Sequence, residues 1–319
     1  AEAEKLMLED GYLAPIYQKA SAYLEKDYVS GIVNNSWGAD YTYTYADVDK
    51  DDKVLNLATS SDIPTLDLSK ATDQQSFQTA NTTMEGLTRV DAEGKVQPGV
   101  AESWETSEDG LTWTFKLRKN STWSNGTPVT AHDFEYSWKR TLTPETASEY
   151  SYIMADIVGS STKEIEANGV DGVGVKALDD YTLEVKLNRP VAYFAELVSF
   201  QVFFPQNQAF VESCGDAYGS AADKQLYNGP FTLTSWKMED QFTMEKNPNY
   251  WDAANVKLNK INTKVVKDTG AEVSLYEAGQ IDRAGLSSDY VDKYKDSKEF
   301  HTRDVASVFM LQVNGGNNK

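Results

Sequence analysis

The sequence predicts an α/β fold organised in one or two compact units. Segments in which every second residue is apolar, as in a half-buried strand, alternate with segments in which apolar residues recur every three or four positions, as in an amphipathic helix. The 319 residues are 40% hydrophobic and 25% charged, which is an ordinary globular composition. This length leaves room for two units of roughly 150 residues each.

The beginning of the chain predicts a helix end followed by extended segments. Residues 1–10 are expected to end a helix at Gly11, because glycine commonly follows the last helical turn. Residues 14–19 and 21–26 are expected to form two strands, and aromatic residues alternate with polar ones over 37–45. This first part of the chain is therefore expected to be mainly extended.

A change of character follows near residue 50. The stretch 47–53 is charged and poor in apolar residues, so it is expected to be a linker before a buried strand over 54–59. Apolar residues at helical spacing predict a helix over 77–87, which Gly86 allows to end.

The middle of the chain gives the sharpest local signals. Alternating apolar residues predict a strand over 111–117, and Asn125-Gly126 is typical of a tight turn. Thr130 and Asp133 have the spacing of a capping box, which predicts a helix start. The remaining predicted elements are a strand over 181–187, a short helix over 192–198, strands over 231–236 and 242–245, and a helix over 271–278 closed by Gly279.

The charge and the rare residues exclude several function classes. The 30 basic and 49 acidic residues give a net charge of −19, which would repel a phosphate backbone, so nucleic acid is not expected as a partner. His132, His301 and Cys214 cannot assemble a zinc, copper or iron–sulfur site. No segment has the length and apolarity of a membrane span, and the beginning does not resemble an uncleaved signal peptide.

No catalytic motif is found. There is no G-x-S-x-G elbow and no P-loop, and the glycines of 169–174 have the wrong spacing for a dinucleotide motif. His132 is a candidate general base, but its place in the first turn of a predicted helix favours a structural role. Carboxylates are abundant, and spacing alone singles out no glycosidase pair. We therefore expect no enzymatic activity and no cofactor.

One acidic stretch has the beginning of a calcium loop. Asp47, Asp49 and Asp51 follow the spacing of its first ligands, but Asp52 occupies the position of the invariant glycine and Ala58 that of the bidentate glutamate. A metal site is therefore not expected.

Long runs of the sequence resemble the oligopeptide-binding proteins of ABC importers. The runs include V-Q-P-G-V-A-E-S-W-E from Val96, L-T-W-T-F-K-L-R from Leu111, W-S-N-G-T-P-V-T-A-H-D-F-E-Y-S-W-K-R from Trp123, G-V-K-A-L-D-D-Y-T-L-E-V from Gly174, Y-N-G-P-F from Tyr227 and K-N-P-N-Y-W-D from Lys246. They follow the family's order and extend over residues 51–319. Residues 1–48 resemble the far carboxyl end of the same family, so the order is circularly permuted.

The resemblance implies one lobe of a type II periplasmic-binding-protein clamshell, with a mixed sheet, flanking helices and an inserted subdomain. Residues 1–48 would join the ligand-facing subdomain, 49–53 would be the linker, 54–74 and 206–319 would complete the ligand-facing subdomain, and 75–205 would form the inserted one. The family's second lobe has no counterpart in this sequence.

The resemblance further implies that this lobe presents half of a groove in which an extended peptide is held by main-chain hydrogen bonds. The positions matching the family's groove-lining stretches are Ser61, Asp62, Ile63, Tyr150, Gly285, Leu286, Ser287, Phe309 and Met310. Structural alternatives are that Asp62 caps a turn before Pro64, that Tyr150 is a packed surface ring, and that Phe309 or Met310 belongs to the core.

Partners and location follow from the same resemblance. Oligopeptides would bind this lobe weakly, the parent protein would dock on a membrane permease, and the chain would be a monomer. The location would be extracellular, or the cell surface through a lipid anchor of the parent. The alternative is a receptor lobe for another small solute such as an oligosaccharide, since function lies in the site and not in the fold.

Overall fold

The computed structural model describes residues 2–11, 13–35, 38–91 and 93–312, and it divides into two units. The smaller unit combines Ala1–Asp27 with Asp268–Lys319, and the larger unit is Tyr28–Lys267. The chain passes from one unit to the other after Asp27 and after Lys267. The expected subdomain boundaries at 74/75 and 205/206 both fall inside the larger unit, and they remain a prediction.

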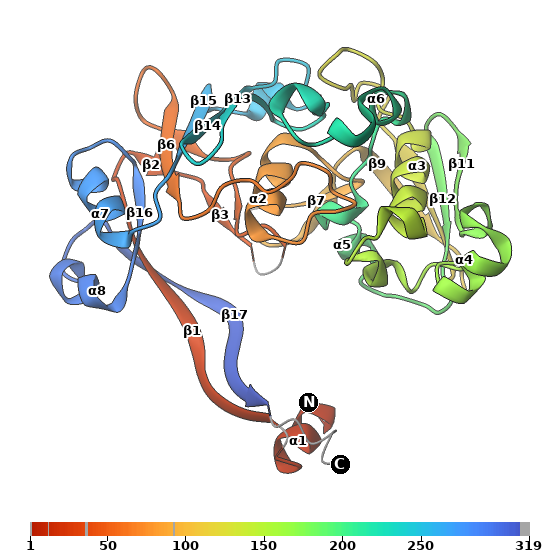
Figure 1. Cartoon of the computed structure of the whole chain (residues 1–319), viewed down its shortest axis with the longest axis horizontal. Coiled ribbons are helices and arrows are strands. Elements are labelled where there is room, and N and C mark those ends of the chain that lie inside the picture. Colours follow the sequence, from red (N-terminus) through yellow and green to blue (C-terminus); the bar gives the residue numbers. More distant parts are fainter. Residues whose placement is uncertain (1, 12, 36–37, 92, 313–319) are drawn as a thin grey trace. The chain divides into compact units, whose positions relative to one another are not determined.

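A three-stranded antiparallel sheet organises the smaller unit (Figure 1). Strand β1 (Leu13–Glu25) pairs along its length with β17 (Phe300–Gln312), while β16 (Arg283–Leu286) pairs only with the last four residues of β1. The two strands predicted over 14–26 are thus one strand, which absorbs two register shifts instead of breaking. Helix α1 (Glu2–Glu9) precedes it, as predicted, and α7 (Thr269–Glu277) and α8 (Ser288–Tyr294) flank β16 in sequence.

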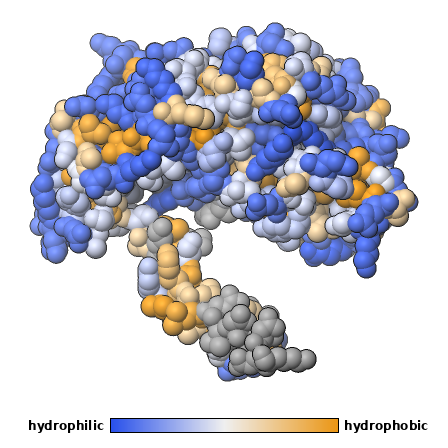
Figure 2. All heavy atoms as spheres, in the orientation of Figure 1, coloured by the Kyte–Doolittle hydropathy of each residue, from blue (hydrophilic) through white to orange (hydrophobic). Residues whose placement is uncertain are grey.

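Beyond the reach of β16, β1 and β17 form a two-stranded ribbon whose apolar side chains are uncovered. Val308, Phe309, Met310 and Leu311 are 44–63% exposed although they are consecutive. Because successive strand residues point to opposite faces, neither face of the ribbon is covered. Figure 2 shows this as apolar surface along the ribbon. The expectation that Phe309 or Met310 belongs to the core is therefore wrong.

A mixed sheet forms the first core of the larger unit. Its strand order is β13 (Phe231–Lys237), β14 (Gln241–Lys246), β15 (Lys260–Val265) and β6 (Val54–Thr59), and only β15 and β6 are parallel. Leu55, Phe231 and Phe242 alternate with more exposed residues and are buried between the sheet and its covering segments. This confirms the predicted α/β class with a mixed sheet.

A second core lies around the sheet β11 (Val175–Asp179), β12 (Thr182–Lys186), β10 (Thr112–Leu117) and β9 (Ala101–Thr106). Helix α3 (Ala131–Leu142) packs on it and begins as predicted, with the Thr130 amide donating to Asp133 Oδ2 at 2.8 Å. On this helix Phe134 and Trp138 are completely buried. The predicted Asn125-Gly126 turn is confirmed, with Gly126 at φ +85°.

Helix α2 (Gln74–Thr83) positions much of the site described below. Its start is fixed by Asp73, whose side chain accepts a hydrogen bond from the Ser76 amide. It ends before the predicted Gly86, because Met84 is already extended. The other short helices are α4 (Thr162–Asn168), α5 (Phe194–Leu197), α6 (Gln208–Cys214), η1 (Pro144–Thr146), η2 (Ser151–Met154), η3 (Val170–Gly172), η4 (Gln201–Phe203), η5 (Gly215–Ala217), η6 (Ala222–Lys224) and η7 (Ala253–Asn255).

The remaining strands are short pairs: β2 (Val29–Ser30) with β5 (Asp47–Val48), β3 (Val33–Asn34) with β4 (Tyr41–Thr42), and β7 (Thr88–Val90) with β8 (Val96–Pro98). Of the alternating stretch 37–45, residue 37 lies outside the described residues, and only β4 is a strand. Val48 is fully buried, so the expected linker over 47–53 is wrong at its beginning. Residues 49–52 are an exposed turn, and Lys53 Nζ ties it back to Asp47 Oδ1 at 2.9 Å.

A short Gly-Ser insert between Lys50 and Asp51 is expected to lower the free energy of unfolding by less than about 1 kcal/mol, since loop-closure entropy grows slowly with length. Urea unfolding would measure this. The same insert between Asp47 and Val48, inside β5, serves as the comparison and should cost several times more. Equal losses would show that the exposed turn is packed structure.

Candidate functional site

The amino-terminal half of α2 lines two neighbouring hollows in the larger unit. The first, about 220 Å³, we call the polar pocket. Its hydrogen-bonding groups include the side chains of Thr59, Ser61, Gln74, Gln75, Gln78 and Thr79. Ser61 is the second residue after β6, so the end of this strand places a predicted site residue in the pocket lining. Amide and hydroxyl groups of this kind can donate to and accept from a peptide backbone, and Asp40 adds one carboxylate to the lining.

The second hollow, about 400 Å³, we call the aromatic pocket. It is lined by Gly38, Thr72, Gln74, Phe77, Tyr150, Ile153, Leu197 and Phe200. Gln74 belongs to both pockets, which are therefore contiguous at the first turn of α2. The structure thus brings two of the predicted site residues, Ser61 and Tyr150, to adjoining pockets.

Asp62 and Ile63 face the protein more than the pockets. Asp62 Oδ1 accepts from the indole Nε1 of Trp236 at 2.9 Å, and Oδ2 accepts from the Glu239 amide at 2.6 Å. Asp62 Oδ1 also accepts from the Ile63 amide at 2.7 Å, directly before Pro64 as the structural alternative expected, and the longer-range contacts fasten the β13–β14 turn to the end of β6. Ile63 is 2% exposed and belongs to the core beneath the mixed sheet.

Tyr150 combines the two roles that the sequence left open. Its ring meets Phe77 edge-on at a centroid distance of 5.4 Å and lies 5.9 Å from that of Phe200. The ring is half-buried by these contacts, and it still lines the aromatic pocket. Packing fixes the ring, so it offers a pocket wall whose side-chain entropy is already lost before a ligand arrives.

The other predicted site residues lie in the smaller unit. Gly285 and Leu286 are in β16, where the Gly285 amide donates to Glu272 Oε1 at 2.8 Å and burial raises the pKa of that carboxyl. Ser287 is the residue before α8. Phe309 stacks on Tyr17 across the ribbon, with centroids 4.8 Å apart and planes 5° from parallel. Met310, the next residue, is 44% exposed.

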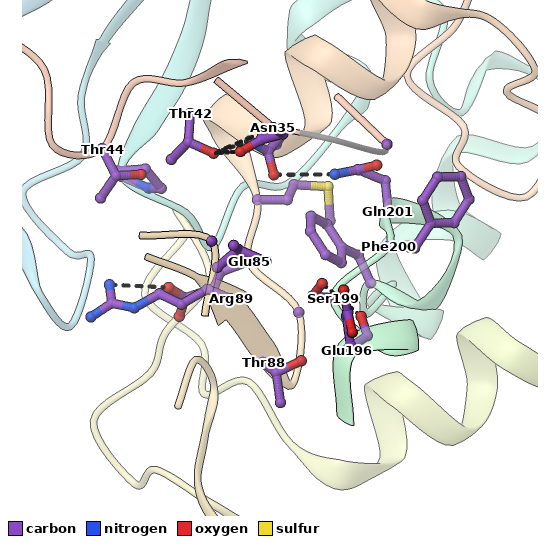
Figure 3. A pocket seen from close by; sticks show the side chains of 18 of the residues that line it. Asn35, Thr42, Thr44, Glu85, Thr88, Arg89, Glu196, Ser199, Phe200 and Gln201 are labelled. Atoms are coloured by element: carbon purple, nitrogen blue, oxygen red, sulfur yellow. Dashed lines mark hydrogen bonds and ion pairs between the residues drawn. The ribbon is translucent and has the colours of Figure 1, made fainter. Parts of the chain in front are cut away.

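Sequence reasoning missed a third hollow, of about 130 Å³, at the carboxyl end of α2 (Figure 3). Its lining includes Glu85 and Arg89, and Figure 3 places them across from Gln201 and Phe200. We call it the Glu85 cavity. The pair was visible as an acid and a base four residues apart, but that spacing normally predicts a surface pair on a helix, whereas here the helix has already ended.

The Glu85 carboxylate is nevertheless well provided with donors. The hydroxyl of Tyr250 donates to Oε1, the indole of Trp251 donates to Oε2 at 2.6 Å, and Arg89 Nη1 lies 3.6 Å from Oε1. Arg89 also pairs with Asp252 at 3.0 Å. Burial raises the pKa of Glu85 and that of Tyr250. These groups form one network, and it links the two cores of the larger unit because Glu85 lies beside Leu87 of the one and Tyr250 belongs to the other.

Metal chemistry gains no support from the described residues. They contain no group of three or more acidic, histidine or cysteine side chains able to hold an ion. Lys53 donates to the Asp47 carboxylate and holds its pKa below the usual value, so the calcium-loop spacing is used for an ion pair. His132 is exposed near Asp180. No helix in the described part of the chain is long and apolar enough to cross a membrane.

Residues 95–319 match the family of bacterial extracellular solute-binding proteins, family 5, middle region. The chain belongs to this family. Family 5 proteins are solute-binding proteins. This confirms the predicted resemblance to peptide receptors, and it confirms the fold class that the resemblance implied.

Individual family 5 relatives agree. The oligopeptide-binding protein OppA of Bacillus subtilis is 39% identical over 249 residues, which are 76% of this chain and 46% of that protein. The structure of Listeria monocytogenes OppA bound to peptide is 41% identical with a TM-score of 0.76, and the match covers 78% of this chain and 49% of that one. A substrate-binding domain of an oligopeptide ABC transporter from Bacillus anthracis matches at 46% identity and a TM-score of 0.77, over 78% of this chain and 48% of that one. The chain thus spans about half the length of these family 5 relatives.

Proposed function

We propose that this chain is one lobe of an oligopeptide receptor of an ABC importer and that it presents one wall of a peptide groove. The observation that carries the proposal is the similarity, at 41% identity over 78% of the chain, to a receptor solved with peptide bound. The polar and aromatic pockets are the part of the larger unit where such a ligand would lie. Residues 1–48 would belong to the same lobe in permuted order, as their resemblance to the family's carboxyl end suggests.

The chemistry of the pockets supports binding over catalysis. Hydroxyl and amide side chains gather at the polar pocket, and rings gather at the aromatic pocket. This combination suits an extended peptide whose backbone needs hydrogen bonds and whose side chains need room. The activity proposed is therefore reversible binding outside the cytoplasmic membrane, with delivery to a permease, by a chain that is monomeric and not an enzyme.

An NMR titration of the labelled chain would test the proposed function. Mixed tri- to octapeptides at millimolar concentration are expected to shift the amides of residues 59–61 and 74–79, whereas maltose-type oligosaccharides should leave them unchanged. Ser61→Trp, which would fill the mouth of the polar pocket, should weaken the peptide response several-fold. Ser103→Trp on the exposed strand β9 is the matched control. Shifts with the sugars and none with the peptides would favour the oligosaccharide alternative.

A further inference from the structure

The aromatic pocket differs from the rest of the molecule in carrying no charge. One quarter of the chain is charged and its net charge is −19, yet none of the described residues that line this pocket is acidic or basic. A charged ligand group placed there would lose its hydration and find no counterion. The described lining thus offers no counterion to a charged ligand group.

Its floor is also preformed. Phe77 and Phe200 are 3% and 8% exposed, and their ring centroids are 5.1 Å apart. Tyr150 touches both rings, and Tyr152, which is 68% exposed, stacks on Tyr150 at 5.9 Å. Rings prefer offset or edge-on partners at such distances. A further ring from a ligand could meet the pocket in these geometries without rearranging it.

The polar pocket beside it is lined mainly by hydrogen-bonding side chains and includes one carboxylate, Asp40. Thr59 Oγ1 donates to Gln75 Oε1 at 2.7 Å, and Gln75 Nε2 lies 3.5 Å from Thr79 Oγ1. These are neutral groups that exchange hydrogen bonds easily with a ligand backbone. Because Gln74 lines both pockets, a ligand in the polar pocket would have the aromatic pocket next to it.

We propose that the aromatic pocket is a side-chain subsite that selects a bulky uncharged residue, above all an aromatic one, at one position of the bound peptide. This proposal rests on the proposed function and adds selectivity to it. A phenylalanine side chain buried there in place of alanine should tighten binding about tenfold or more. Lysine or glutamate at the same position should give no gain, because the cost of desolvating the charge opposes the burial of its stem.

The test compares tripeptides that differ in one side chain. Ala-Ala-Ala, its three single phenylalanine variants and the corresponding lysine and glutamate variants are titrated into the chain by NMR. One phenylalanine peptide is expected to bind about tenfold tighter than Ala-Ala-Ala and to shift the ring signals of Tyr150. Equal affinities for all peptides would overturn the selectivity while leaving the proposed function in place.

Two variants place a charge in the aromatic pocket. Ile153→Lys changes its wall, and Thr72→Lys changes its exposed rim, where folding is not at risk. Each should remove the gain from phenylalanine, so that the phenylalanine peptide binds no more tightly than Ala-Ala-Ala to the same variant. Leu178→Lys makes a matched change at a 51% exposed position on β11, away from both pockets, and should keep the gain. A gain that survives both pocket variants would overturn the proposal.

Failure of the function and failure of the subsite are separable. If no tripeptide binds at all, the peptide-receptor function fails, and p-cresol then probes the pocket directly. Shifts of the Tyr150 ring by p-cresol in the parent chain, lost in Thr72→Lys or Ile153→Lys, would support an aromatic subsite. The absence of such shifts would overturn it.

Discussion

Replacing Arg89 with methionine is expected to lower the free energy of unfolding at neutral pH by about 3–5 kcal/mol, because the change leaves Glu85 buried without the cation that lies 3.6 Å from it. Glu85 is 4% exposed, and Arg89 is the cationic group that most strongly lowers its pKa. The methionine fills a similar volume, so the loss reports the charge more than a cavity. Urea unfolding followed by far-UV circular dichroism measures it.

The loss should depend on pH with a definite sign. Burial places the pKa of Glu85 above its ordinary value of 4.5 in the folded chain. Such a carboxyl favours the fold fully below its unfolded pKa, and this contribution is lost as pH rises through the folded pKa. Without Arg89 the folded pKa rises further. The difference in stability between variant and parent should therefore be larger at pH 8 than at pH 5.

Arg189→Met is the matched control. Arg189 also pairs with an aspartate, Asp156, at 2.7 Å, but its side chain is 60% exposed. Exposed pairs contribute about 0–1 kcal/mol, so this variant should be nearly as stable as the parent at either pH. If Arg89→Met behaved in the same way, the network around the Glu85 cavity would not depend on its charge balance.

A full-length relative such as Bacillus subtilis OppA is expected to bind its best peptide at least about a hundredfold more tightly than this chain does. Immobilising a peptide costs about 4–15 kcal/mol whichever protein does it. A single wall returns fewer contacts, and each hydrogen bond left open to water contributes only a small net amount. Calorimetric titration of both proteins with the same peptide set measures the ratio.

The contrary result would be informative. Submicromolar binding would mean that this chain holds a complete site by itself, or that a second copy supplies the missing wall. Light scattering on the same samples separates these two explanations, since only the second requires a dimer.

Local signals predicted the elements best. The capping box at Thr130 and the turn at Asn125-Gly126 depend on neighbours within a few residues, and both are confirmed. The predicted end of α2 was wrong, since Met84 is already extended. Its side chain belongs to a core assembled from distant parts of the chain, which local patterns do not reveal. The two strands predicted before residue 26 merged for the same reason, since only their pairing with β17 makes them one element.

The candidate site also combines residues that the sequence predicted with contacts that it could not predict. The resemblance selected Ser61 and Tyr150, which the structure places at adjoining pockets. Asp62 accepts a hydrogen bond from Trp236, which lies 174 residues away in the sequence, and no local pattern predicts this contact. The Glu85 cavity was missed because its members lie after the ends of different elements and meet only in the folded chain.

The ribbon of β1 and β17 has a consequence for how the chain behaves in concentrated solution. β17 is the outer strand of its sheet, and no charged residue occurs between Val305 and Gln312. Natural edge strands are usually protected by charges, bulges or covering segments against pairing with another molecule. The net charge of −19 keeps copies apart only over the screening length of the buffer. The solubility of the isolated chain should therefore fall steeply with added salt. It would depend on pairing between copies at the uncharged edge of β17, and not on the free energy of unfolding of either core.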